Sequence, residues 1–233
     1  MAAQAVRNFR RGHDERQWMS PVIDCTTEEG QAKGIAAAAE AIRRGELVVM
    51  PTDTVYGLGA DAFAPDAVTA VLVAKGRGRE MPPPVLVPGP RTVDGLATNV
   101  PAYARDLIEA FWPGPLTLVL LVQSSLMWDL GETNGTVALR MPQDDTALKL
   151  LDEVGPMAVT SANVSGQAPA RTVLEAAAQL GSAVSVYLDA GPCPGTLPST
   201  ILDCTGEAPL ILRAGALSVG RIQEVLGEVE LRN

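Results

Sequence analysis

Histidine is almost absent from this sequence, since His13 is the only one among 233 residues. It lies in a polar N-terminal stretch. Its isolation argues against Ser-His-Asp and Cys-His nucleophilic machinery and against histidine-based zinc sites. Any chemistry in this chain must therefore come from positioning, from fixed cations and hydrogen-bond donors, or from a carboxylate.

Cysteine and long apolar runs are also scarce. Cys25, Cys193 and Cys204 are odd in number and lack CxxC spacing, which argues against a disulfide framework or a zinc knuckle. The longest apolar runs, such as 116–122, are too short to cross a bilayer, and no apolar signal-peptide core follows the arginines near the N-terminus. We therefore expect three buried thiols in a cytoplasmic protein that does not associate with membranes.

The charge balance is acidic, with a net charge of −9 and only 4% aromatic residues. This composition argues against bulk electrostatic binding of nucleic acid and against base stacking on aromatic platforms. Lysine occurs only at Lys33, Lys75 and Lys149, so the run from Lys75 to Arg79, KGRGR, is a conspicuous local cluster of cations. A weak direct contact with RNA through a basic patch stays open.

Helical and strand patterns alternate along the chain from residue 26 onward. The patterns predict helices at 27–44, 66–75, 102–111, 146–154, 173–180 and 218–226. They predict strands at 47–50, 85–87, 116–122, 137–141, 157–160, 184–188, 200–202 and 210–212. Strands interleaved with helices indicate an α/β fold with a twisted open sheet, and the late strands without helices between them indicate a mixed sheet. We predict one domain over 21–233, after a disordered extension at 1–20.

Short polar side chains gather where predicted strands begin or end. The stretch PTDTVYGLG follows the strand at 47–50, TSANVSG follows 157–160, and PST opens the strand at 200–202. Hydroxyl and amide groups there suit a small polar substrate, because α/β proteins bind ligands at strand ends. For each stretch the alternative is a turn whose hydroxyls cap local backbone groups. The glycines at 57 and 59 open no helix and no GxxxxGK[ST] occurs, which excludes a dinucleotide fingerprint and a Walker-type site.

Arginine and lysine form the second kind of candidate site. The KGRGR run ends a predicted helix, where cations suit the macrodipole, but its glycines also allow an anion close to the backbone. Such a cluster would neutralise a polyphosphate well. Arg140 and Arg213 stand within apolar strand patterns, which is costly unless each is paired or reaches a ligand. A solvent-facing position in the strand is the alternative for both.

Seven stretches, taken in this order, resemble the YrdC-like L-threonylcarbamoyladenylate synthase family. They read PTDTVYGLGADAF, AKGRGR, FWPGPLTLVL, TVALRMP, TSANVSG, PSTILDCTG and LILRAGALS, and they span roughly residues 31–226. Each motif alone is weak, whereas seven in family order are highly specific. The resemblance implies an α/β twisted open sheet with a large, concave, positively charged surface over the active site.

The resemblance also implies an activity. Family members form threonylcarbamoyl-AMP and pyrophosphate from L-threonine, bicarbonate and ATP with Mg²⁺, for threonylcarbamoyladenosine modification of tRNA. Downstream tRNA threonylcarbamoyl-transfer proteins are then the implied partners. The chemistry needs neither a histidine nor a covalent enzyme intermediate, which agrees with the scarcity of histidine.

Site residues follow from the resemblance, motif by motif. The implied threonine contacts are Thr52, Arg140, Thr160 and Ser199. The implied nucleotide contacts are Lys75, Arg77, Arg79, Thr136, Ser161, Asn163 and Arg213. Lys75 and Arg77 match the pair that faces the ATP phosphates and are the implied catalytic residues. No carboxylate cluster fixes ligands for the metal.

Three departures from the family pattern stand out. The stretch 81–84, MPPP, replaces a single proline followed by leucine. The extension at 1–20 has no counterpart in the family pattern. The extra C-terminal domain of the longer family members, in turn, has no match in this sequence. Two alternatives to the synthase stay open, a carbamoyl-adenylating hydrogenase-maturation factor of the same fold and a non-catalytic RNA-binding module.

Overall fold

A computed structural model describes residues 20–231, so the predicted disordered extension at 1–20 lies outside the described residues except for Ser20. The strands are β1 (Val22–Asp24), β2 (Val48–Met50), β3 (Gly57–Asp61), β4 (Val85–Leu86), β5 (Ala97–Thr98), β6 (Leu116–Val122), β7 (Thr136–Arg140), β8 (Met157–Ser161), β9 (Val186–Asp189), β10 (Thr200–Asp203), β11 (Leu210–Arg213) and β12 (Glu230–Leu231). The helices are α1 (Glu28–Arg43), α2 (Pro65–Lys75), α3 (Val93–Leu96), α4 (Ala102–Phe111), α5 (Asp145–Val154), α6 (Val173–Leu180) and α7 (Val219–Leu226), with short 3₁₀ turns at η2 (Pro90–Thr92) and η3 (Gly181–Ala183).

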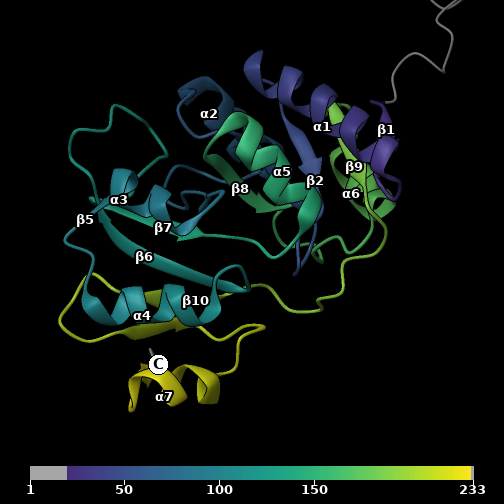
Figure 1. Ribbon diagram of the computed structural model, residues 1–233. Helices are drawn as coiled ribbons and strands as arrows, with labels where there is room; N and C mark the ends of the chain where they lie inside the picture. Colours follow the sequence, from purple (N-terminus) through teal and green to yellow (C-terminus); the bar gives the residue numbers. More distant parts are fainter. Residues whose placement is uncertain (1–19, 232–233) are drawn as a thin grey trace, which may run out of the picture.

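All these strands belong to one mixed sheet. Its order is β1-β9-β2-β3-β8-β4-β7-β6-β10-β11-β12, and β5 pairs with β6 at the side. Parallel pairs such as β10 with β6 stand beside antiparallel pairs such as β6 with β7. The predicted α/β fold with an open mixed sheet is confirmed, and Figure 1 shows the helices arranged around that sheet.

Helix ends follow the capping signals of the sequence. The Thr27 hydroxyl accepts the amide hydrogen three residues on and so begins α1. Asp144, Thr172 and Ser218 cap α5, α6 and α7 in the same way. Helix α2 ends at Gly76, whose φ of 64° is left-handed and suits glycine. This turn directs the residues after Gly76 away from the helix axis.

Two pairs of helices cover opposite faces of one half of the sheet. Helices α1 and α5 pack with Val48 and Met50 of β2 and with Leu188 of β9. Helices α2 and α6 pack with Val49 and Tyr187 of the same two strands. Successive strand residues point to opposite faces, so a run that is apolar throughout serves both cores.

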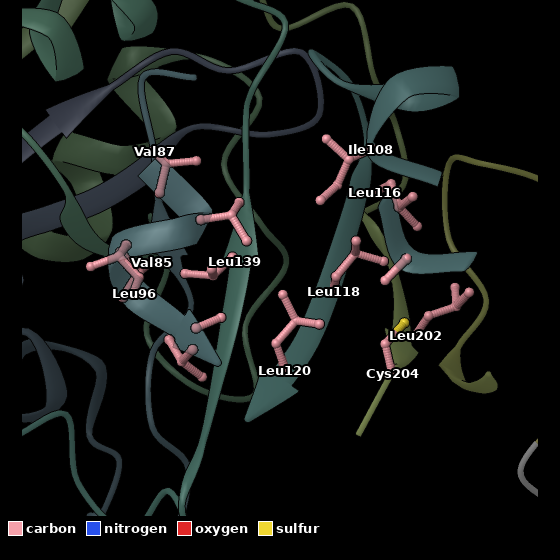
Figure 2. Close-up of a cluster of buried hydrophobic side chains, with 14 of the residues drawn as sticks. Val85, Val87, Leu96, Ile108, Leu116, Leu118, Leu120, Leu139, Leu202 and Cys204 are labelled. Carbon is pink, nitrogen blue, oxygen red and sulfur yellow. The ribbon is translucent and has the colours of Figure 1, made fainter. Parts of the chain in front are cut away.

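The other half of the sheet has its core on one side. Figure 2 shows Leu116, Leu118 and Leu120 of β6 in a cluster with Leu139 of β7 and Leu202 of β10. Helices α3, α4 and α7 contribute the opposing apolar side chains of this cluster. In Figure 1, α4 and α7 lie beside β6 and β10, away from α1 and α6. The alternate residues of β6 and β7 are therefore left to face the other side.

Strand β3 is the main element that the sequence patterns did not predict. The sequence patterns assigned no strand to residues 57–61, yet these residues pair with β2 and β8 within the sheet. A Cβ at Gly57 would lie 2.7 Å from Val159 Cγ1, and one at Gly59 would lie 2.9 Å from Met157 Cε. Glycine stands in this strand because the neighbouring strand's side chains fill the space.

Candidate active site

A cavity of about 410 Å³ opens on the sheet face opposite the core of Figure 2. The alternation within the strands produces it. Thr117 and Val119 of β6 line the cavity between leucines that point into the core. Thr136 and Arg140 of β7 and Ile201 of β10 line it in the same way. The cavity thus has a floor of sheet residues and a wall of loops that follow the strands.

Most of the residues predicted from the resemblance meet in this cavity. Those that line it are Thr52, Arg77, Thr136, Arg140, Thr160, Ser161, Ser199 and Arg213. They come from loops and strands spread from β2 to β11. The structure therefore brings cations and hydroxyls that are distant along the chain into one cavity. Lys75, Arg79 and Asn163 lie outside its lining.

Arg140 is the most deeply held of the cavity arginines, with 6% of the residue exposed. Its Nη2 donates to Asp53 Oδ1 at 2.5 Å, its Nη1 to Thr54 Oγ1 at 3.1 Å and its Nε to the Gly114 carbonyl at 3.0 Å. Burial lowers the pKa of Arg140, and the charge of Asp53 opposes that shift. These contacts fix the guanidinium plane at the base of the cavity.

Arg77 and Arg213 bring two further guanidinium groups to the same wall. Arg77 Nε donates to Ser165 Oγ at 3.0 Å, and Arg213 Nη2 donates to the Ser199 carbonyl at 2.8 Å. Desolvation at the cavity wall lowers the pKa of Arg213, and the charges of Arg140 and Arg77 lower it further. The cavity lining contains no Asp or Glu. An anionic ligand would therefore relieve the mutual repulsion of these cations.

The hydroxyl groups of the cavity are also held by neighbours. Thr52 Oγ1 donates to the Val55 carbonyl at 2.6 Å, so it closes the turn after β2 as well as lining the cavity. Ser199 Oγ and Thr117 Oγ1 lie 2.8 Å apart and are both buried. Thr160 Oγ1 lies 3.4 Å from Arg77 Nη1. The sequence left two interpretations open for these segments, a capped turn and a ligand site. Thr52 fits both, because its hydroxyl closes the turn and also lines the cavity.

The KGRGR run divides among three environments. Lys75 is fully buried, and its Nζ donates to oxygens of Ser161 and Asn163. Arg77 lines the cavity. Arg79 is exposed and pairs with Asp129 at 2.7 Å. Three cations that are equivalent in the sequence pattern therefore face the interior, the cavity and solvent.

Several residues of the site were not singled out from the sequence. Asp53 holds Arg140, Thr54 contacts the same guanidinium, and Thr117 supports Ser199. Asp53 and Thr54 stand in the PTDT stretch, and Thr117 interrupts a leucine run, so their polarity was visible. The prolines at 82–84, where the sequence departs from the family pattern, form part of the cavity wall.

The side chains that line the cavity indicate whether it could hold a metal ion by itself. Within residues 20–231 no three His, Cys, Asp or Glu side chains are grouped closely enough to hold a metal ion. The cavity lining offers hydroxyls and guanidinium groups instead. These side chains do not fit a resident Mg²⁺ ion, because Mg²⁺ prefers carboxylate and phosphate oxygens and the lining contains no carboxylate.

No helix in the described part of the chain is long and apolar enough to span a membrane.

Comparison with known proteins identifies the family. The Sua5/YciO/YrdC family model, described as telomere recombination, matches residues 40–215. The chain belongs to this family. A Mycobacterium leprae member, provisionally named as a threonylcarbamoyl-AMP synthase, is 58% identical over 211 residues, which cover 91% of this chain and 96% of that relative. The threonylcarbamoyl-AMP synthase of Pyrococcus abyssi is 37% identical over 84% of this chain and 58% of its own length.

Solved structures of the family agree with the fold. The crystal structure of P. abyssi Sua5 complexed with L-threonine matches with a TM-score of 0.87 at 35% identity, over 91% of this chain and 63% of that one. The Escherichia coli YciO structure matches with a TM-score of 0.78 at 24% identity, over 88% of this chain and 100% of that one. The latter similarity concerns the fold alone. This chain thus corresponds to the part shared by the longer and the shorter family members.

Proposed function

We propose that this protein is an L-threonylcarbamoyladenylate synthase, which makes threonylcarbamoyl-AMP and pyrophosphate from L-threonine, bicarbonate and ATP. The observation that carries the proposal is the cavity where Arg77, Arg140 and Arg213 meet a set of hydroxyls without any carboxylate in the lining. Such a surface suits a polyphosphate beside a small polar molecule that bears a carboxylate. Relatives named threonylcarbamoyl-AMP synthase support the choice of reaction.

The chemistry needs positioning and charge stabilisation rather than a nucleophilic side chain. The threonine amine attacks the carbon of bicarbonate, water leaves, and a carbamate forms. A carbamate oxygen then attacks the α-phosphorus of ATP, the bond to the β-phosphate oxygen breaks, and pyrophosphate leaves. Fixed guanidinium groups stabilise the negative charge on the phosphoryl oxygens. Mg²⁺ enters as part of the substrate, bound to ATP, in keeping with a cavity that lacks carboxylates.

The roles within the cavity follow from position and chemistry. We infer that Arg140 binds the threonine carboxylate, with Thr52, Thr160 and Ser199 around the rest of that substrate. Arg77 and Arg213 then bind the phosphates, with Thr136 and Ser161 on the nucleotide side. Asn163 and Arg79 lie outside the cavity lining, so Asn163 would support this side through its contact with Lys75 and Arg79 would assist from outside the cavity. Arg140 suits a carboxylate because Asp53 neutralises part of its charge, whereas Arg77 and Arg213 have no carboxylate partner among the described residues. The product would pass to proteins that transfer threonylcarbamoyl groups to tRNA.

Pyrophosphate release is the direct test. Purified protein with Mg²⁺-ATP and bicarbonate should release pyrophosphate only when L-threonine is added. Arg140→Ala should reduce this release about a hundredfold or more. Arg105→Ala is the matched control, because Arg105 is exposed and pairs with Asp94 on the surface, and it should retain the activity.

The alternatives predict other outcomes. Turnover without threonine, or turnover that requires carbamoyl phosphate, would replace the proposal with a carbamoyl-adenylating activity. RNA binding in a gel-shift assay without pyrophosphate release would replace it with an RNA-binding module.

A further inference from the structure

Lys75 has a saturated hydrogen-bond environment inside the fold. It is fully buried, and its Nζ lies 2.6 Å from the Ser161 carbonyl, 2.5 Å from the Asn163 carbonyl and 3.0 Å from Asn163 Oδ1. Ser161 Oγ is a fourth oxygen, at 3.3 Å. An ammonium group has three N–H donors. The bonds of this lysine are therefore all made before any substrate binds.

The contact between the end of α2 and the segment after β8 runs in both directions. The Ser165 amide donates to the Lys75 carbonyl at 2.9 Å, and Ser165 Oγ accepts from Arg77 Nε at 3.0 Å. Gly76, in its left-handed conformation, turns the chain between Lys75 and Arg77. Lys75 thus holds residues 161–165, and Ser165 within this segment holds the guanidinium of Arg77 at the cavity wall.

We propose that Lys75 is a positioning residue that ties residues 161–165 to helix α2, and that it acts on the substrates through Thr160, Ser161 and Arg77 rather than by binding phosphate. The part of this proposal that concerns substrates rests on the proposed function. The part that concerns the folded segment does not, because it is a property of the protein without ligands.

An apolar residue could not replace Lys75, because it offers neither the N–H donors nor the charge that these buried oxygens require. Two main-chain carbonyls, of Ser161 and Asn163, point at the buried Nζ, and leaving them without donors is costly. Burial and then the charge of Arg77 lower the pKa of Lys75 to about 8, so the ammonium form still predominates at neutral pH. To reach a phosphate, Nζ would have to break bonds to main-chain oxygens.

Hydrogen exchange of the ligand-free protein tests the structural half. In Lys75→Met the amides of residues 161–167 should exchange about tenfold faster or more, because the segment loses charge-assisted bonds. Arg77→Met is the matched control and should leave exchange at residues 161–163 as in the wild type. Wild-type exchange in Lys75→Met would overturn the proposal. If Lys75→Met does not fold, Lys75→Gln, which retains two N–H donors, should show a smaller increase, and wild-type exchange there would overturn the proposal equally.

Threonine binding without ATP tests the functional half by calorimetry. Lys75→Met should weaken threonine binding about tenfold, because Thr160 and Ser161 lose their fixed positions. A lysine that only bound phosphate would leave this affinity unchanged, and that result would overturn the proposal. Ser165→Ala keeps Lys75 but releases Arg77, so it should raise the KM for ATP and leave threonine affinity close to the wild-type value. Absence of threonine binding in the wild type would instead contradict the proposed function, while hydrogen exchange still tests the role of Lys75.

Discussion

The buried ion pair of Arg140 and Asp53 leads to a stability prediction that depends on the architecture of the cavity. Their side chains are 8% and 10% exposed, and Asp53 Oδ1 also accepts the Gln143 amide hydrogen at 2.9 Å. Asp53→Asn keeps the shape and an acceptor oxygen but removes the negative charge. Its new amide nitrogen would replace Oδ2, which is buried and without a hydrogen-bond partner among the described residues. Arg140 is then left as a buried cation without a counter-charge.

Removing one partner of a buried pair typically costs about 3–5 kcal/mol, because the remaining charge stays desolvated. The hydrogen bonds of Arg140 to Gly114 and Thr54 persist, so we expect the lower end, about 3 kcal/mol. The matched control is Asp129→Asn. Asp129 pairs with Arg79 on the surface, where the side chains are 45% and 52% exposed, and its loss should cost less than about 1 kcal/mol.

Urea denaturation at neutral pH, followed by circular dichroism, gives both free energies of unfolding. For a domain of this size the predicted difference also lowers the Tm by roughly 4–12 °C. In the pyrophosphate assay Asp53→Asn should raise the KM for threonine, since the Arg140 guanidinium loses the contact that orients it. Equal losses of stability in Asp53→Asn and Asp129→Asn would refute the reasoning, because the pair would then behave as an exposed one.

Three more predictions concern other parts of the structure. Arg77→Ala should lower kcat/KM for ATP about a hundredfold, as measured by pyrophosphate release, because a guanidinium that faces the phosphates is lost; a change below threefold would contradict this role. A Cβ at Gly215 would lie 2.3 Å from the Pro198 carbonyl oxygen, so Gly215→Ala should lower the free energy of unfolding by about 1–3 kcal/mol. Gly220→Ala in α7, where a Cβ meets nothing within 4 Å, should raise it by up to about 1 kcal/mol, and the opposite order in urea denaturation would contradict the packing. Lys75 has a folded-state pKa of about 8 against a usual 10.5, so the unfolded chain holds more protons between these values and stability should rise with pH there, by up to about 1.4 kcal/mol per unit; Lys75→Met should show a shallower rise, and an equal slope would exclude the titration of Lys75.

Local signals predicted the elements whose packing agrees with their own pattern. The helix at 102–111, the strand at 116–122 and the helix at 173–180 have the predicted bounds. Strand β3 was not predicted, because its glycines suit the neighbouring side chains of Met157 and Val159 rather than any propensity of their own. The short strands β1, β5 and β12 were also missed, since two or three residues carry no periodicity.

The candidate site, like the fold, was predicted from the sequence only in part. The resemblance to the family predicted that Arg140, Arg213 and the hydroxyl residues share one site, and these residues do line one cavity. The directions of Lys75 and Arg79 depend on contacts with Asn163 and Asp129, which lie far away in sequence. The partner of Arg140 is 87 residues away, so its identity as Asp53 required the fold. Tertiary contacts, rather than residue type, decide which cation of the KGRGR run lines the cavity.

The central claim is that one cavity holds a nucleoside triphosphate beside an amino acid. A crystal structure of the protein with L-threonine and a non-hydrolysable ATP analogue tests it most directly. The account predicts both ligands in the cavity, with phosphate oxygens in hydrogen-bond contact with Arg77 and Arg213 and the threonine carboxylate in contact with Arg140. A nucleotide bound elsewhere on the molecule, with these arginines contacting neither ligand, would contradict it.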